Sequence, residues 1–466
     1  MATAALRYGG LAGALLLAVA GARSGQRWIA LPTWLAGTVL LTGAWLVLGR
    51  RLSGVGLRWL LVTGALWALP VLVSLPLASR DVYAYACQGS LVTHGMDPYA
   101  NGAANLPCPW LSTVPRMWRF TPSPYGPLWL VISGAAAASR SIVVAVGLFK
   151  LVALAGMVLV GWAGHRLARA LGTDPVRAAW LGLLSPLVLV HALSGAHNDA
   201  LLAGLILAAV AAAVTLPPTA TRPLVAGALL GLAVAVKATA LVVLPFLALL
   251  LVADRRWWPV IRAAAVASLG IVGAYGVLWA LTGYGLGWLS ALSNTARLVV
   301  EWTSIPTGVG MGAARALSLA GQPGLAHHAV AAFRLLGLVA LAAVLVGLWW
   351  WARGRTRPEH VVVAVGLALL AVVLLAPVAF PWYALAPLAV LAYGLTDDRR
   401  RYLVGLLVTP AMLLILPSGN GLATLSKAPG YVIDGLLVLG AVALAVRYLL
   451  RRRSRPTREP ELAGQP

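Results

Sequence analysis

Long apolar segments follow one another along almost the whole chain, separated only by short polar links. Of the 466 residues, 61% are hydrophobic and 10% are charged, whereas a soluble domain carries roughly a quarter charged residues. A helix needs about 20 mainly apolar residues to cross the hydrocarbon core of a bilayer. The pattern therefore predicts an all-α polytopic membrane protein with about 12–14 transmembrane helices.

The expected helices follow from the apolar segments. They lie near 7–22, 28–48, 59–78, 142–163, 178–193, 199–215, 224–236, 238–252, 261–281, 327–352, 361–378, 381–395, 402–417 and 429–449. The segment Gly126–Ala138 would break the alternation of sides if it crossed, so we expect a short helix in the outer interface. The first 22 residues lack a charged start followed by an A-x-A site, so we expect a retained helix.

The net charge of +23 comes from arginines clustered between the apolar segments, as at Arg50-Arg51, Arg255-Arg256 and Arg399-Arg400-Arg401. This positive-inside pattern sets orientation in a membrane and gives little reason to expect a nucleic-acid partner. It predicts one transmembrane domain over 1–450 with both ends in the cytoplasm. Large exoplasmic loops are then expected at 79–141 and 282–326, with a tight turn at 194–200 and a basic, disordered cytoplasmic tail at 451–466.

The stretch from Ser79 to Gly102 holds the first acid of the chain, Asp81, and there are only 12 acids in all. An acid at the mouth of a membrane helix suits a general base that acts on a hydroxyl group, although a salt-bridged acid at a helix end is the alternative. The neighbouring Arg80 would keep Asp81 ionised or bind a phosphate. Asp97 precedes a proline, so it is either a second functional acid or a turn residue.

His197-Asn198-Asp199 forms a polar group between two apolar segments. Either it faces a substrate cavity, or Asn198 or Asp199 caps the following helix. Neither an H-x-x-x-H nor an H-E-x-x-H pattern occurs in the sequence, so it does not support a metal site.

Lys237 interrupts an apolar segment, where a cation is costly unless it reaches an anion or water. It is a candidate for holding a lipid-linked phosphate, with Arg297 as a second cation; snorkelling to lipid headgroups is the alternative.

Tyr125 and Trp382-Tyr383 lie at expected helix mouths, although aromatic belts are normal at membrane interfaces. Together with Tyr83, Tyr99 and Trp302 they could line a sugar-sized pocket. The only cysteines, Cys87 and Cys108, both lie in the first expected outer loop. In an oxidising space they would be able to form a disulfide; two free thiols are the alternative.

The motifs together resemble actinobacterial polyprenol-phosphomannose-dependent α-1,6-mannosyltransferases, which are GT-C glycosyltransferases. The resemblance rests on Ser79-Arg80-Asp81-Val82-Tyr83, Gly95-Met96-Asp97-Pro98-Tyr99, Pro124-Tyr125-Gly126-Pro127-Leu128, Gly195-Ala196-His197-Asn198-Asp199-Ala200, Lys237-Ala238-Thr239 and Pro245-Phe246. The resemblance implies a GT-C-like fold in which Asp81 is the catalytic base and Lys237 meets the donor phosphate. It leaves the segment 100–123 without a counterpart.

The resemblance further implies inverting transfer of mannose from polyprenyl-phosphate-mannose to an α-1,6-mannan glycolipid at the outer face of the cell membrane. We expect no metal cofactor, contact with membrane lipids and a monomer. A transferase of another polyprenyl-phosphate sugar, such as arabinose, is the first alternative. A lipid-linked sugar flippase is the second, but the two pseudo-symmetric halves with broken helices typical of transporters are not seen in the sequence.

Overall fold

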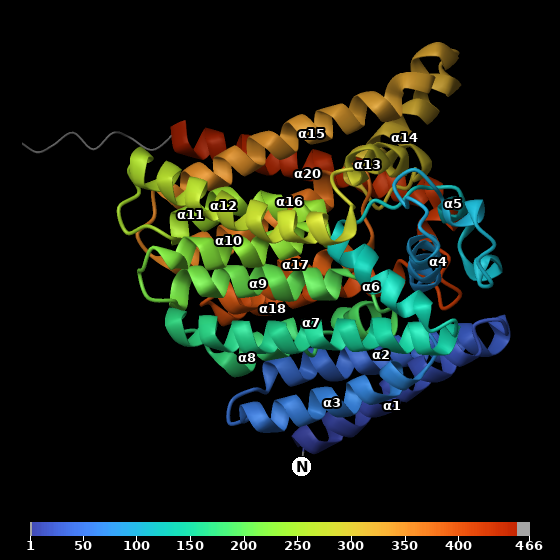
Figure 1. Cartoon of the computed structure of the whole chain (residues 1–466). Helices are drawn as coiled ribbons and strands as arrows, with labels where there is room; N and C mark the ends of the chain where they lie inside the picture. Colours follow the sequence, from blue (N-terminus) through green and yellow to red (C-terminus); the bar gives the residue numbers. More distant parts are fainter. Residues whose placement is uncertain (1, 454–466) are drawn as a thin grey trace, which may run out of the picture.

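The computed structural model describes residues 2–453, and these residues are mainly helical (Figure 1). In chain order the α-helices are α1 (Ala2–Ala22), α2 (Arg27–Arg50), α3 (Leu57–Val73), α4 (Asp81–Thr93), α5 (Arg116–Arg119), α6 (Pro127–Ala138), α7 (Ile142–Leu171), α8 (Pro175–Gly182), α9 (Asp199–Thr215), α10 (Thr221–Val234), α11 (Leu244–Leu250), α12 (Trp257–Thr282), α13 (Trp288–Leu298), α14 (Ile305–Leu319), α15 (Pro323–Arg353), α16 (Pro358–Leu375), α17 (Leu385–Gly394), α18 (Asp398–Val408), α19 (Leu422–Leu425) and α20 (Lys427–Arg453). Over residues 2–453 there is no β-sheet, which confirms the predicted all-α class.

Seven of the described helices are long and apolar enough to cross a membrane, or eight if one bent pair counts as a single span. The chain is thus a multi-pass membrane protein, but fewer helices qualify individually than the 12–14 predicted. Proline explains part of the difference, because it disfavours helix at the preceding residue. The apolar segment 178–193 is interrupted before Pro186, and α18 ends at Val408, before Pro410. Several predicted spans are therefore short helices joined by 3₁₀ or π-helical turns.

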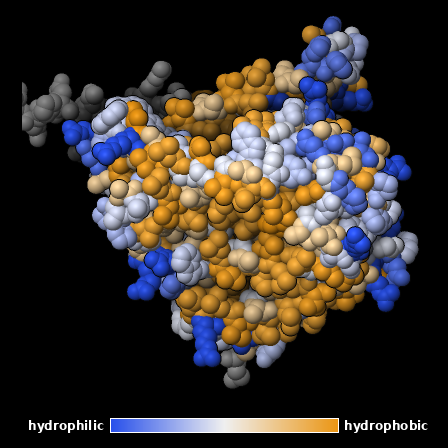
Figure 2. All heavy atoms as spheres, in the orientation of Figure 1, coloured by the Kyte–Doolittle hydropathy of each residue, from blue (hydrophilic) through white to orange (hydrophobic). Residues whose placement is uncertain are grey.

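The long helices lie side by side, and their outer surface is a broad apolar band between two polar margins (Figure 2). The width of a bilayer's hydrocarbon core requires such a band. At one end of the bundle lie the links from α7 to α8 and from α11 to α12, and at the other lie α4 and α5 (Figure 1). The bundle therefore has two polar ends, one on each side of the apolar band.

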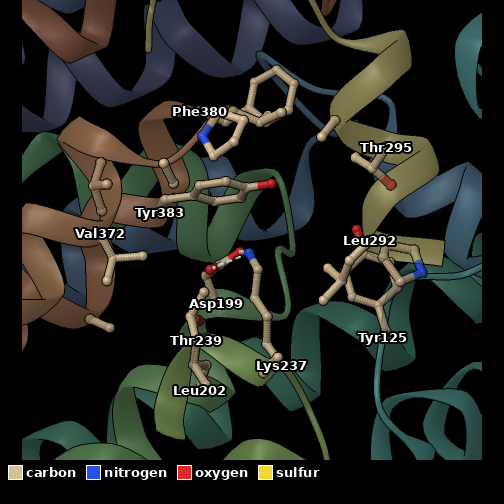
Figure 3. A pocket seen from close by; sticks show the side chains of 18 of the residues that line it. Tyr125, Asp199, Leu202, Lys237, Thr239, Leu292, Thr295, Val372, Phe380 and Tyr383 are labelled. Carbon is tan, nitrogen blue, oxygen red and sulfur yellow. Dashed lines mark hydrogen bonds and ion pairs between the residues drawn. The ribbon is translucent and has the colours of Figure 1, made fainter. Parts of the chain in front are cut away.

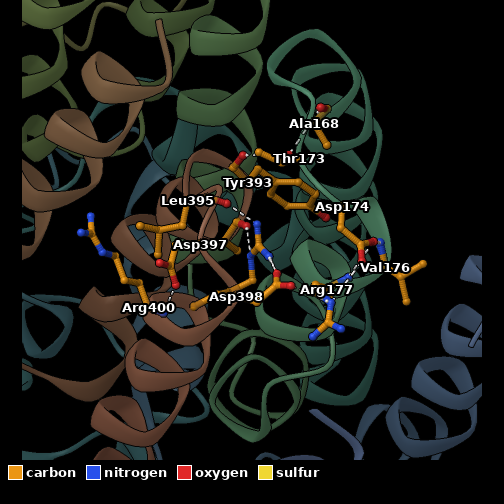
Figure 4. Close-up of polar contacts among 12 residues, drawn as sticks. Ala168, Thr173, Asp174, Val176, Arg177, Tyr393, Leu395, Asp397, Asp398 and Arg400 are labelled. Carbon is orange, nitrogen blue, oxygen red and sulfur yellow. Dashed lines mark hydrogen bonds and ion pairs between the residues drawn. The ribbon is translucent and has the colours of Figure 1, made fainter. Parts of the chain in front are cut away.

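Arg177 and the predicted cluster Arg399-Arg400-Arg401 come together around shared acids (Figure 4). Arg177 forms ion pairs with Asp174 and Asp398, with N–O distances of 3.3 and 3.1 Å. Arg401 is almost fully buried and donates to Asp398 at 2.6 Å and to the carbonyl oxygens of Ala392 in α17 and of Leu395 just after it. The link before α8 is thereby fastened to the start of α18, as expected if these basic clusters share one side of the membrane.

The opposite end is built on α4 and α6. These two helices approach so closely that a Cβ atom at Gly89 would lie 1.9 Å from the carbonyl oxygen of Ser133, so only glycine fits there. Tyr85 of α4 packs edge-on against Trp129 of α6 and Phe149 of α7, with ring centroids 5.0 and 5.8 Å apart. The short helix expected over Gly126–Ala138 is confirmed as α6, and its packing fixes where α4 begins.

The tail predicted at 451–466 lies mostly outside the described residues. Its first three residues, Arg451–Arg453, are the last turn of α20.

Candidate active site

A cavity of about 540 Å³ lies between the helix ends near α4 and the apolar middle of the bundle (Figure 3). Its charged lining groups are Asp81, Asp199 and Lys237, and its lining tyrosines are Tyr125 and Tyr383. Most of the remaining wall is aliphatic, and it comes from α9, α13, α15, α16 and α17. Examples are Leu202, Leu292, Leu338, Val372 and Ala386. One compartment thus combines a few polar groups with a long apolar wall, as ligand cavities often do.

Lys237 enters this cavity from a point where the helical backbone is interrupted. It lies between α10 and a 3₁₀ turn over Ala238–Val243, in an extended conformation. Its ammonium group donates to both carboxylate oxygens of Asp199, at 2.8 and 3.1 Å, and lies 3.6 Å from the ring centroid of Tyr383. Only 12% of the side chain is exposed, so Lys237 does not snorkel to the surface. The cation that interrupts the apolar segment in the sequence therefore points into the cavity.

Asp81 is the first residue of α4, and its carboxylate reaches the same cavity. Its Oδ1 accepts a hydrogen bond of 3.2 Å from the indole N–H of Trp118. Burial raises the pKa of the Asp81 carboxyl group to about 7, while the Trp118 hydrogen bond acts in the opposite direction. A carboxyl group with a pKa near neutrality is suited to accept a proton during a reaction.

His197 lies behind Asp81 rather than in the cavity. It is fully buried, with Nδ1 3.8 Å from Oδ2 of Asp81 and 3.5 Å from the Tyr85 hydroxyl oxygen. Its ring stacks on Trp382 at a centroid distance of 3.9 Å. His197 therefore contacts the candidate base, and its contacts are those of a supporting residue.

The roles of Asn198 and Asp199 differ from the predicted capping of the following helix. Asn198 occupies the position before α9, but its side chain makes no capping hydrogen bond, and within residues 2–453 its amide atoms have no partner. The carboxylate of Asp199 instead binds Lys237. Of the three polar residues in this group, Asp199 lines the cavity, and His197 and Asn198 are buried without lining it.

Sequence comparison decides the family. A profile described as "Alpha-(1->6)-mannopyranosyltransferase, N-terminal domain" matches residues 2–253, and one described as "MptB C-terminal domain" matches residues 306–450. The chain belongs to the α-(1→6)-mannopyranosyltransferase family. It is accordingly a multi-pass membrane mannosyltransferase.

Curated relatives cover most of its length. Alpha-(1->6)-mannopyranosyltransferase A of Mycobacterium tuberculosis is 37% identical over 399 residues, which are 82% of this chain and 74% of the relative. A probable alpha-(1->6)-mannopyranosyltransferase of Mycolicibacterium smegmatis is 34% identical over 91% of this chain and 82% of its own. Alpha-(1->6)-mannopyranosyltransferase A of Corynebacterium glutamicum is 30% identical over 74% of this chain and 75% of its own. The predicted actinobacterial family is therefore confirmed. No solved structure matches the chain significantly, so the GT-C likeness stays a prediction.

Other predicted site residues of this mannosyltransferase lie outside the cavity. Asp97 is a turn residue, because its Oδ1 accepts the backbone N–H of Tyr99 at 2.8 Å. Tyr99 packs edge-on against Tyr284, with ring centroids 6.0 Å apart. Arg297 is exposed on α13, away from the cavity lining. Arg80 and Tyr83 line a separate cleft, described below.

Trp118 is the site residue that the sequence reasoning missed. It belongs to α5, within the segment 100–123 for which no counterpart was found. The structure joins Cys87 and Cys108 in a disulfide, which ties this segment to α4. The pairing with Asp81 gave no local sequence signal, since it joins residues 37 positions apart.

Residues 2–453 contain no group of three or more His, Cys, Asp or Glu side chains arranged to hold a metal ion. Metal independence of this mannosyltransferase remains a prediction.

Proposed function

We propose that this mannosyltransferase moves mannose from polyprenyl-phosphate-mannose to the 6-hydroxyl group of an α-1,6-mannan acceptor, with inversion at the anomeric carbon, on the outer face of the cell membrane. One observation carries the proposal: a carboxylate, Asp81, and an ammonium group, Lys237, share a cavity whose remaining wall is mainly aliphatic.

The aliphatic wall favours a lipid-linked donor. Leu289, Leu292 and Leu338 line the cavity and are also 53%, 40% and 44% exposed, so part of the wall reaches the apolar outer surface. A donor whose prenyl chain stays in the membrane would be able to bring its phosphate sideways to Lys237. A soluble nucleotide sugar would gain nothing from such a wall, because its base and ribose need polar partners.

Asp81 and Lys237 would take complementary roles in the transfer. Asp81 accepts the proton of the acceptor hydroxyl group, while the oxygen of that hydroxyl group forms the new bond to the anomeric carbon. The bond between that carbon and the phosphate oxygen breaks, and the polyprenyl phosphate departs with the electron pair. Lys237 stabilises the charge on the departing phosphate, which it can do only by sharing its protons between that phosphate and Asp199. Attack from the side opposite the phosphate inverts the configuration.

The distribution of arginines supports the outer face. The basic clusters of Arg177 and Arg401 meet at one end of the bundle, and α4 begins near the other. Basic residues concentrate on the cytoplasmic side of membrane proteins. The relatives named as mannopyranosyltransferases favour mannose over arabinose, and an enzyme over a flippase.

The test is transfer by the purified protein from radiolabelled polyprenyl-phosphate-mannose to a synthetic α-1,6-dimannoside, with and without a chelator. We expect a chelator-insensitive product with the α-1,6 linkage. Transfer from polyprenyl-phosphate-arabinose but not from the mannose donor would contradict the proposal, as would transfer from a nucleotide sugar alone.

A further inference from the structure

A second cleft, of about 180 Å³, lies beside the start of α4 and shares no lining residue with the main cavity. Its wall comes from four parts of the chain: the end of α1 and the link that follows it, the link before α4 with the first turn of α4, the disulfide-anchored segment before α5, and the turn that follows residue 416. The polar residues that line it are Ser24, Ser79, Arg80, Tyr83, Ser112, Thr113 and Ser418. It is the more polar of the two compartments, because the main cavity is largely aliphatic.

Several polar groups in this cleft are free to bind a ligand. Within residues 2–453 the Arg80 guanidinium makes no hydrogen bond and no ion pair, and the hydroxyl groups of Tyr83, Ser112 and Ser418 are likewise unpartnered. A guanidinium offers five N–H donors, and each hydroxyl group both donates and accepts. Such a mixture suits the ring of hydroxyl groups on a hexopyranose, while the face of Tyr83 offers an apolar surface to its C–H groups. A single cation among hydroxyl groups favours a neutral polyol over a phosphate, for which clustered cations are typical.

The cleft also lies next to the candidate base. Arg80 directly precedes Asp81, and consecutive Cα atoms are about 3.8 Å apart. The Ser79 hydroxyl oxygen accepts the backbone N–H of Asp81 at 3.1 Å. Arg80 and Asp81 thus enter two different compartments from adjacent positions in the chain, which places the cleft beside the residue that carries the candidate base.

We propose that this cleft is an acceptor subsite, which binds a hexopyranose unit of the acceptor chain next to, but not at, the reacting unit. The assignment rests on the proposed function for the nature of the acceptor. The donor lipid and its phosphate use the main cavity and Lys237, so the subsite contributes to acceptor affinity and not to donor affinity.

The experiment compares an acceptor of one sugar unit, methyl α-mannoside, which leaves the subsite empty, with α-1,6-tetramannoside, which fills it, at a saturating donor concentration. One variant removes the cation, Arg80→Ala, and another fills the cleft, Ser112→Phe. Arg116→Ala is the matched control, since Arg116 is an exposed arginine of the same segment that lines neither compartment. Loss of a charged hydrogen bond corresponds to about tenfold or more in affinity. We expect Arg80→Ala to raise KM for the tetramannoside by that factor and Ser112→Phe to raise it in the same direction, with a much smaller change for methyl α-mannoside and none in donor KM.

Three outcomes would overturn the subsite. An equal loss of kcat on both acceptors would mean that Arg80 acts through Asp81. A rise in donor KM would mean that the cleft binds a phosphate or lipid headgroup. Unchanged kinetics in both cleft variants would mean that nothing binds there.

A binding measurement separates this inference from the proposed donor. Tetramannoside binding to the purified, donor-free protein is followed by saturation-transfer NMR, and Arg80→Ala and Ser112→Phe should weaken it while Arg116→Ala does not. If the donor proves to be another polyprenyl sugar, this binding still stands and only the proposed function fails. If the tetramannoside does not bind the unmodified protein, the subsite fails whatever the donor is.

Discussion

The indole N–H of Trp118 donates a hydrogen bond to Oδ1 of Asp81, although the two residues belong to different helices and lie 37 positions apart. Trp118 is carried by the segment that the Cys87–Cys108 disulfide ties back to α4, the helix that begins at Asp81. The candidate base and the residue that orients it thus flank, on either side, the loop 87–108 that the disulfide closes. This relationship makes the segment 100–123 part of the candidate active site.

The first prediction is that Asp81→Asn nearly abolishes mannosyl transfer while the protein still inserts and folds. The amide has about the same shape but cannot accept the acceptor's proton. General-base catalysis contributes about 10²–10⁴ in rate, and we expect a loss of kcat in that range. The measurement is single-turnover transfer, with unchanged detergent-solubilised melting as the control for folding. Near-normal turnover would exclude Asp81 as the base and direct attention to Asp199.

The second prediction concerns pH. Asp81 must be ionised to act as the base, and its pKa is about 7, so kcat/KM should rise with pH and reach half its plateau near pH 7. At pH 6 the rate should be about tenfold below the plateau. The Trp118 hydrogen bond favours the ionised form, so Trp118→Phe should raise the pKa further and move the half-point to higher pH.

The control for this shift is Trp110→Phe, a tryptophan of the same segment that does not line the main cavity and should leave the half-point unchanged. A pH profile that is flat between 5.5 and 8.5, or a half-point unaffected by Trp118→Phe, would show that Asp81 is not the group whose ionisation limits the reaction.

The sequence revealed the residues that carry charge in an apolar context. Asp81 and Lys237 stood out because each is a costly group at the edge of an apolar segment, and the structure places both at one cavity. The same reasoning did not predict that several of the expected spans are divided into shorter helices. Hydropathy detects the apolar composition of 178–193 but not the interruption of the helix before Pro186. The backbone geometry at that point depends on packing.

The sequence did not show which side chains would contact one another in the fold. Asp199 looked equally suited to cap a helix or to face a cavity, and only the fold shows that Lys237, 38 residues further on, takes its carboxylate. Arg80 was expected beside Asp81 because the two are adjacent, yet successive residues at a helix start point in different directions, and Arg80 faces the second cleft. Contacts between distant segments leave no local pattern to detect.

The third prediction is that Cys87 and Cys108 are bridged in the native protein and that the bridge supports activity. Neither thiol should react with an alkylating reagent until reductant is added, as mass spectrometry would show. A disulfide that closes a loop of this size stabilises by about 2–4 kcal/mol, so Cys108→Ser should lower the melting temperature and, by loosening Trp118, reduce transfer.

Cys87→Ser provides the internal control for the bridge. If the two cysteines act only as a pair, either single substitution and the double substitution should have about the same effect. Rapid alkylation of both thiols without reductant would contradict the prediction directly. Additive losses in the double variant would show that each thiol has a separate role.

The last prediction separates two roles for Lys237, support of the fold through Asp199 and binding of the donor phosphate. Removing one partner of a buried ion pair leaves the other charge unpaired, which typically destabilises a protein by about 3–5 kcal/mol, whereas replacing both partners by apolar residues is often neutral. Lys237→Ala alone would therefore not distinguish support of the fold from binding of the donor phosphate. The double variant Lys237→Met/Asp199→Leu removes the pair without leaving a buried charge, and Lys237→Arg keeps the charge with a different shape.

If Lys237 holds the donor phosphate, the double variant should melt near the unmodified protein yet need a donor concentration about ten- to a hundred-fold higher, since a charge-assisted hydrogen bond contributes about 1.5–3 kcal/mol. Lys237→Arg should retain part of the activity, and acceptor KM should change little in both variants. The measurement is initial transfer rate against donor and acceptor concentration, with thermal melting in parallel. Restored activity in the double variant would reduce Lys237 to a structural role. A defect confined to acceptor KM would instead place Lys237 on the acceptor side of the cavity, because the donor phosphate would then be held by other groups.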